Sequence, residues 1–266
     1  MPTAAELEQS LFALAPREGA AEWDNVGLLV GDPARSVSKI LVALDITQAV
    51  AEEAVALGCD AIVAHHPVMN CRWLPVQTLR QDDPQGRLLR LLVTTDMAAV
   101  CMHTNLDTAV GGVNDALAEA LELIDPGPLC ADGLGRVGSL KEPMELGDFA
   151  AFVREKLGCS ALRYADAGRK VYRVAVGGGA CGDLESDAVA AGCDTFVTSD
   201  IKYHQFLDAP GHGINLIDAG HFPTENPVCE KLTDYLKAQF PEVTVLKSAV
   251  HREVIRCCGE NEGCHE

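Results

Sequence analysis

A repeated segment is the feature that most restricts how this chain can fold. Two stretches of sequence match at one constant offset of 134 residues, without a gap, over two predicted strands and the helix between them. The matches are the triplets 54–56 and 188–190 (AVA), the triplets 58–60 and 192–194 (GCD), and the apolar pairs Ile40 with Val174 and Val42 with Val176. Two α/β units that merely share glycine stops and alanine-rich helices are the alternative, but a fixed offset over all three elements favours an internal duplication. The sequence therefore predicts an α/β fold of two similar lobes.

The pattern of apolar residues predicts strands and helices in the same order in each half. Short apolar runs predict buried strands, and longer periodic stretches that stop at glycine or proline predict helices. In the first half the strands are 39–45, 61–64 and 98–102, and the helices are 4–14, 48–57, 85–96 and 113–123. In the second half the strands are 172–176, 195–198, 214–217 and 243–247, and the helices are 183–191 and 224–240.

The division into parts follows from composition. The stretch 124–136 is rich in glycine and proline and lacks apolar periodicity, which predicts a linker. We therefore expect a first α/β lobe over 1–126, a second over 127–218, and a C-terminal helix and strand within 219–266 that return to the first lobe and precede a cysteine-rich tail.

The net charge of −18 argues against nucleic acid as a main partner, because so acidic a surface repels phosphates and no basic stripe offsets it. No apolar run approaches the roughly 20 residues that cross a bilayer. The first residues lack the basic and apolar regions of a signal peptide. We expect a cytoplasmic protein that acts on a small molecule.

Three short motifs carry side chains that bind metals. His65-His66-Pro67 ends a predicted strand, and neighbouring residues there point in opposite directions, so each imidazole can face a different ion. Asp107 follows the strand 98–102, and its carboxylate can bridge two cations. His221 and Glu225 are four residues apart at the start of a predicted helix, so both can reach one ion. Each motif also has an ordinary explanation: loop histidines, a helix cap at Asp107, and a favourable helix dipole at Glu225.

Together the motifs supply three imidazoles and two carboxylates, each at a strand end or a helix start. Such a set suits two divalent transition ions about 3.5–4 Å apart, with a position left open for water. The mixture of nitrogen and oxygen ligands favours zinc, manganese, iron, cobalt or nickel over calcium. The sequence predicts two such ions per chain, held between the two lobes by His65, His66, Asp107, His221 and Glu225.

Six blocks of sequence, in order, resemble the Nif-three-like proteins, also named GTP cyclohydrolase I type 2 homologues. The blocks are 22–32 (EWDNVGLLVGD), 43–47 (ALDIT), 65–67 (HHP), 103–107 (HTNLD) continued by 111–115 (GGVND), 198–204 (TSDIKYH) and 218–225 (DAGHFPTE). The resemblance covers nearly the whole chain. It implies a duplicated α/β fold, a ring-shaped hexamer and a dinuclear metal centre, with the five ligands above at the matching positions.

The resemblance also places His103 and His204 at polar positions around that centre. With Asp200, they are the candidates for proton transfer. The chain is a short form, because the stretch between its halves leaves no room for the extra domain that some members carry. The tail with Cys257, Cys258 and Cys264 is not a feature of the family; it is either a metal-trapping arm or a disordered end.

The resemblance and the motifs are compatible with three classes of function. The leading hypothesis is metal-dependent hydrolysis of a nucleotide-like or phosphorylated small molecule, GTP cyclohydrolase-like by resemblance only. The alternative is a non-enzymatic metal-binding or metal-handling scaffold that acts through partner proteins. A DNA-linked regulator is a third class, which the net charge of −18 disfavours.

Overall fold

The computed structural model describes residues 1–69 and 77–258, and its chain divides into two units. The first unit contains residues 1–116 and 226–251, and the second contains residues 117–225 and the segment from 252 onward. The chain passes from the first to the second within α5 (Val113–Ala120). Cys264 and the rest of the tail beyond Cys258 lie outside the described residues.

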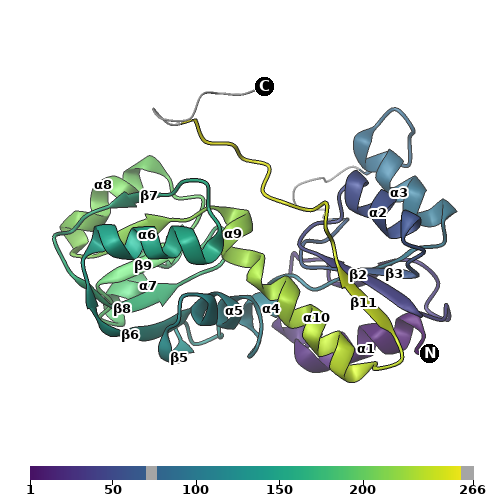
Figure 1. The fold of residues 1–266 in the computed structure, drawn as a ribbon, viewed down its shortest axis with the longest axis horizontal. Coiled ribbons are helices and arrows are strands. Elements are labelled where there is room, and N and C mark those ends of the chain that lie inside the picture. The colour runs from purple at the N-terminus through teal and green to yellow at the C-terminus, as the bar shows by residue number, and fades with distance from the viewer. Residues whose placement is uncertain (70–76, 259–266) are drawn as a thin grey trace. The chain divides into compact units, whose positions relative to one another are not determined.

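The first unit is built on a five-stranded sheet of order β1-β4-β3-β2-β11. These strands are β1 (Gly27–Val30), β4 (Ala98–Cys101), β3 (Ala61–Ala64), β2 (Lys39–Ala43) and β11 (Thr244–Lys247). All neighbours are parallel except β1, which runs antiparallel to β4. Figure 1 shows α1 (Ala4–Leu14) and α10 (Pro227–Gln239) on one face of this sheet, and α2 (Gln48–Ala56) and α3 (Pro84–Thr94) on the other.

Helix starts in this unit follow from local sequence. Thr3 and Glu6 form a capping box at α1, in which each side chain bonds the other residue's backbone N–H. The Asp83 side chain accepts from the N–H of Gly86, and Pro84 occupies the first turn of α3, where the missing N–H costs nothing. Alternate strand residues such as Leu41, Ile62 and Ala99 pack under α2 and α3 in one apolar cluster.

The second unit is built on a six-stranded sheet of order β5-β6-β8-β9-β10-β7. Its strands are β5 (Ile124–Pro128), β6 (Arg136–Met144), β8 (Val171–Val176), β9 (Thr195–Thr198), β10 (Asn215–Asp218) and β7 (Arg163–Ala165). Helix α6 (Leu146–Leu157) covers one face, with Phe149 and Val153 against Val174 and Val176. Helices α7 (Glu185–Ala190) and α8 (Tyr203–His212) cover the other face, around Phe196.

The expected duplication is confirmed down to strand register. Adding 134 to the bounds of β3 gives the bounds of β9, and the helix between the strands shifts with them. Ile40 pairs with Ala61 across β2 and β3, and the residues 134 positions later, Val174 and Thr195, pair across β8 and β9. The likeness extends to the sheet edges, because β1 runs antiparallel to β4 as β7 does to β10. Both units therefore repeat one arrangement of four strands.

Two expectations about local structure are wrong. The stretch 124–136 is not a linker: it forms β5 and the turn into β6, and prolines are tolerated in β5 because it is an edge strand. The helix expected over 224–240 is two helices, α9 (His221–Glu225) and α10. Pro227 has no N–H to continue the first helix and begins the second instead.

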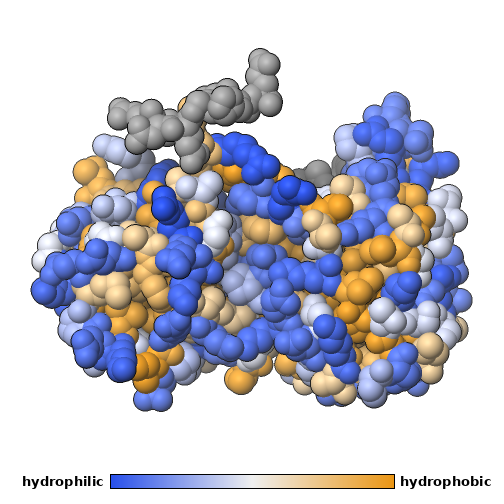
Figure 2. All heavy atoms as spheres, in the orientation of Figure 1, coloured by the Kyte–Doolittle hydropathy of each residue, from blue (hydrophilic) through white to orange (hydrophobic). Residues whose placement is uncertain are grey.

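Hydrophilic residues interleave with hydrophobic ones over the face in Figure 2. Among the described residues, none of the helices combines the length and the apolar character needed to cross a lipid bilayer.

Candidate metal centre

Three histidines of the first unit gather where two neighbouring parallel strands end. His65 and His66 follow β3, and His103 lies two residues after β4. One ring nitrogen from each lies within 4.8 Å of those of the other two, a spacing that can hold a metal ion. The His65 side chain is fully buried, and the His66 and His103 side chains are 22% and 9% exposed, so the cluster opens to solvent on the His66 side.

Each of these imidazoles is oriented through Nδ1. His65 donates to the backbone carbonyl of Met102 at 2.8 Å, His66 to Oδ1 of Asp45 at 2.7 Å, and His103 to Oδ1 of Asp24 at 2.8 Å. A carbonyl and an ionised carboxylate can only accept, so each Nδ1 carries a proton, and in a neutral imidazole Nε2 then carries the lone pair. This pairing of an imidazole with an acceptor on its far side is typical of metal-binding histidines.

Asp24 holds both His103 and the start of the next helix. Its Oδ2 accepts from the backbone N–H of Thr104 at 3.0 Å and from the Thr104 hydroxyl at 2.5 Å, at the first residue of α4 (Thr104–Thr108). Burial disfavours the ionised carboxyl, but the hydrogen bonds from His103 and Thr104 outweigh burial and hold the pKa of Asp24 well below its usual range. The carboxylate is therefore ionised at neutral pH and remains an acceptor for His103.

Asp107 brings a carboxylate to the same cluster. It lies on α4, and its Oδ1 is 3.5 Å from Nε2 of His65. The side-chain amide of Asn114 donates to the Asp107 carbonyl at 2.8 Å, and that of Asn105 donates to the Ala15 carbonyl at 2.7 Å. These bonds fix α4 against its surroundings, so the carboxylate points toward His65 from a firmly held turn.

The second unit has its own imidazole–carboxylate group at the corresponding strand end. His221 and Glu225 begin and end α9, and Nε2 of His221 lies 3.1 Å from Oε2 of Glu225. His221 Nδ1 donates to Oδ2 of Asp200 at 2.6 Å, so His221 is oriented as the first unit's histidines are. Burial lowers the pKa of His221, but hydrogen bonds to Asp200 and Glu225 outweigh burial and raise it to about 10.

The structure thus gathers the predicted residues within each unit. The first unit joins His65, His66 and Asp107 with His103, and the second joins His221 and Glu225 with Asp200. His204 lies on the exposed side of α8, in its first turn. His103 shares the geometry of the candidate ligands His65 and His66.

The donor set of these groups fits a transition metal. Neutral imidazole and carboxylate are ligands of zinc, manganese, iron, cobalt and nickel, whereas calcium prefers a shell made of oxygen alone. The group of buried histidine and acidic side chains can therefore hold a metal ion.

Sequence reasoning gave no role to Asp24, Asp45 and His251, which the structure places behind the histidines. One signal was available for Asp45: it lies two residues after β2, at the same sheet edge as His65 and His66. His251 had no local signal, since it meets Asp45 across 206 residues of chain.

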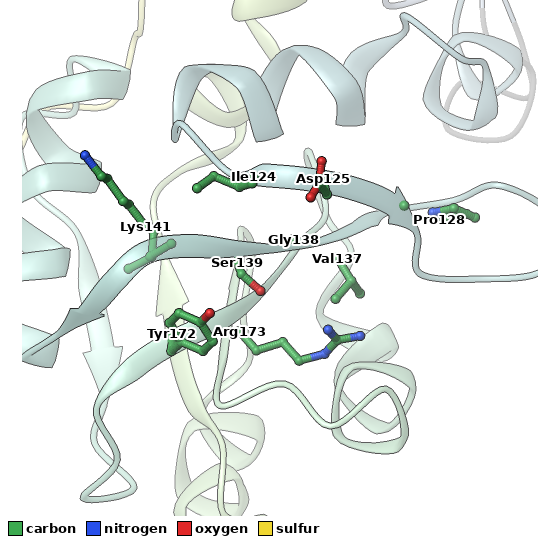
Figure 3. Close-up of a pocket in the computed structure, with 11 residues that line it drawn as sticks. Ile124, Asp125, Pro128, Val137, Gly138, Ser139, Lys141, Tyr172 and Arg173 are labelled. Carbon is green, nitrogen blue, oxygen red and sulfur yellow. The ribbon is translucent and has the colours of Figure 1, made fainter.

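A separate cavity of about 450 Å³ lies on the second unit's sheet, where β5, β6 and β8 adjoin (Figure 3). Its lining includes Ile124, Asp125, Ser139, Lys141, Tyr172 and Arg173. None of the candidate metal ligands is among the lining residues, so this cavity is not part of the candidate centre.

Comparison with known proteins agrees with the resemblance in the sequence. The family model of Duf34/NIF3 (NGG1p interacting factor 3) matches residues 2–253. A Streptomyces coelicolor relative named "GTP cyclohydrolase 1 type 2 homolog" is 40% identical over 242 residues, covering 86% of this chain and 84% of the relative. Staphylococcus aureus hypothetical protein SA1388 superposes with a TM-score of 0.89 at 30% identity, covering 97% of this chain and 100% of that one. A Bacillus cereus protein related to NIF3 reaches a TM-score of 0.91 at 24% identity over 97% and 99% of the two chains, a likeness in fold alone. With a family model matched over almost its full length, this chain belongs to the Duf34/NIF3 family.

Proposed function

We propose that this protein is a metal-dependent hydrolase of a nucleotide-like or phosphorylated small molecule, with two divalent transition ions per chain. The observation that carries the proposal is the cluster of His65, His66 and His103, each held at Nδ1 by an acceptor. Asp107 lies beside this cluster in the first unit, and the second unit supplies His221 and Glu225 as its own pair of candidate ligands.

A bound divalent ion supplies Lewis acidity and lowers the pKa of a water molecule that it holds. The chain's own residues position the ligands and handle protons. Asp200 accepts the Nδ1–H of His221 and keeps the proton on that nitrogen, which leaves Nε2, 3.1 Å from Oε2 of Glu225, as the atom that would bind an ion. Half of the Asp200 side chain is exposed, so it can also exchange protons with solvent, as can the exposed His204.

A purine nucleotide is the first substrate class to test. The Streptomyces coelicolor relative carries the name "GTP cyclohydrolase 1 type 2 homolog". Trp23 supports a planar substrate, because the residue is 40% exposed and its ring centroid lies 6.0 Å from that of His103 in an edge-on arrangement. An exposed indole beside a polar cluster can stack on a heteroaromatic base.

The decisive experiment joins metal analysis to turnover. Protein purified without added metal is assayed for metal content, then for consumption of GTP and a panel of phosphoesters, beside Asp107→Asn. The control Asp82→Asn removes an exposed carboxylate whose ion pair is with Arg80. We expect about two ions per chain and metal-dependent turnover, both reduced in Asp107→Asn and retained in the control. If the metal-loaded protein leaves GTP and every phosphoester unchanged, the proposed hydrolase activity is refuted.

The alternative is a metal-handling scaffold that works through partner proteins. The observation in its favour is the exposure of Cys257 and Cys258 on the C-terminal segment, where thiols can take up a soft metal ion. If the protein is a scaffold, Asp107→Asn should bind less metal but still bind the partner proteins. Neither the variant nor the wild type should then show turnover. The ring-shaped hexamer stays a prediction in either case, and light scattering of the purified protein measures it directly.

A further inference from the structure

His251 lies behind the histidine cluster, in the segment that follows β11. Its side chain is 9% exposed, and its Nε2 lies 2.9 Å from Oδ2 of Asp45 and 3.2 Å from the backbone nitrogen of the same residue. The other oxygen of the same carboxylate, Oδ1, accepts from Nδ1 of His66 at 2.7 Å. One carboxylate thus bridges two imidazoles, and one of those imidazoles belongs to the candidate metal cluster.

The segment that carries His251 is itself anchored to the first unit. Strand β11 lies beside β2 (Figure 1) and pairs with it in parallel. Beyond β11, Glu53 of α2 accepts from the Ser248 hydroxyl at 2.5 Å and from the Ala249 N–H at 2.9 Å. The Ser248 oxygen in turn accepts the backbone N–H of His251 at 3.1 Å. These bonds place the imidazole at a fixed point beside Asp45.

The orientation of the Asp45 carboxylate depends on its hydrogen bonds, because its side chain is only partly buried. Its side chain is 40% exposed, so packing alone leaves the carboxylate able to rotate. An ionised carboxylate accepts on both oxygens, and with both occupied by imidazoles its plane is fixed.

We propose that His251 is a positioning residue for the metal centre: it holds Asp45 at Oδ2, and Asp45 in turn sets the ring orientation and tautomer of His66. This inference rests on the metal-binding part of the proposed function and does not depend on the substrate. Partners behind a ligand typically change metal affinity by about 10–100-fold when they are removed. We expect a loss in that range for His251→Ala, although His251 itself does not contact the metal.

The test is a titration of the full-length, metal-stripped protein with Co²⁺, followed by visible absorption, which reports both affinity and coordination geometry. His251→Ala should weaken binding by about 10–100-fold and alter the spectrum. His251→Gln should restore most of the affinity, because its terminal amide can both donate and accept and so can hydrogen-bond Asp45 where Nε2 did. The control His212→Ala removes a histidine–carboxylate pair of 2.7 Å with Glu185, in the second unit, and should leave the titration unchanged.

A double-mutant cycle separates positioning from general stability. In an Asp45→Ala background, His251→Ala should cause no further loss of Co²⁺ affinity, because its effect passes through Asp45. Equal affinity in wild type and His251→Ala overturns the inference, and so does a loss that Gln does not rescue or that persists in full without Asp45. If wild type binds no Co²⁺, the proposed metal function itself is wrong, which is a different outcome.

Discussion

Gly179 follows β8 in the second unit and lies directly against the His221 and Glu225 pair. Its φ is +66°, in the left-handed region that favours glycine. A Cβ built there would overlap Oε1 of Glu225 and lie 3.0 Å from Cδ of Glu225 and 3.2 Å from Nε2 of His221. Gly179→Ala therefore strains the backbone and pushes a methyl group into the carboxylate at once.

The two effects can be given magnitudes. An alanine in the left-handed region costs about 1–2 kcal/mol. Displacing the Glu225 carboxylate adds about 1–3 kcal/mol, as overpacking of a buried site does, because its side chain is only 5% exposed and has little room to move. The sum is about 2–5 kcal/mol, and at about 2–4 °C per kcal/mol this predicts a Tm about 4–20 °C lower.

The assay is thermal unfolding of the metal-stripped protein together with Co²⁺ titration. Gly192→Ala is the matched control, because Gly192 has a φ of +74° but nothing within 4 Å of its added Cβ. The control should lower Tm through backbone strain alone, about 2–8 °C, and leave metal affinity unchanged. If the two variants have the same Tm and the same Co²⁺ affinity, the close approach of Gly179 to Glu225 contributes to neither stability nor metal binding, and the prediction is wrong.

Three further predictions follow from other parts of the structure. Asp24→Asn removes the charged acceptor of His103 and should weaken metal binding by about 10–100-fold, measured by the same titration; unchanged affinity would show that His103 needs no carboxylate behind it. Because the folded pKa of Asp24 lies below its ordinary value of 3.8, its contribution to stability is present above that value and is lost as the pH falls through the folded pKa. Urea unfolding of metal-stripped protein should therefore show a smaller stability difference between wild type and Asp24→Asn at pH 3 than at pH 7, and a constant difference would contradict the shift. Thr3→Ala breaks the capping box of α1 and should lower the free energy of unfolding by about 1 kcal/mol without changing metal affinity, whereas an effect on affinity would link α1 to the centre.

The sequence predicted the elements that its local patterns specify. The fixed offset located β2, α2 and β3 and their counterparts β8, α7 and β9, because a duplicated unit keeps its glycine stops and apolar strands in place. The strand-end motifs located the candidate ligands, since parallel strands bring their carboxyl ends to one edge of a sheet.

The rest of the fold depends on contacts that no local pattern reveals. Strand β6 and helix α6 were not predicted, although Phe149 and Val153 form the cover of the second sheet. Strand β5 contains two prolines and a glycine, and only its position at the edge of a sheet makes it a strand. The contact of His251 with Asp45 required knowledge that β11 pairs with β2, a contact between opposite ends of the chain.

That pairing has a consequence for synthesis on the ribosome. Residues 117–225 of the second unit are contiguous, so this part can fold while the chain is still emerging. The first unit cannot complete its sheet earlier, because β2 keeps an open edge until β11 has been made. An open parallel edge is a template for pairing with other nascent chains, so slow release of the last residues should favour aggregation. The first unit, whose synthesis begins first, is thus the last to complete its fold.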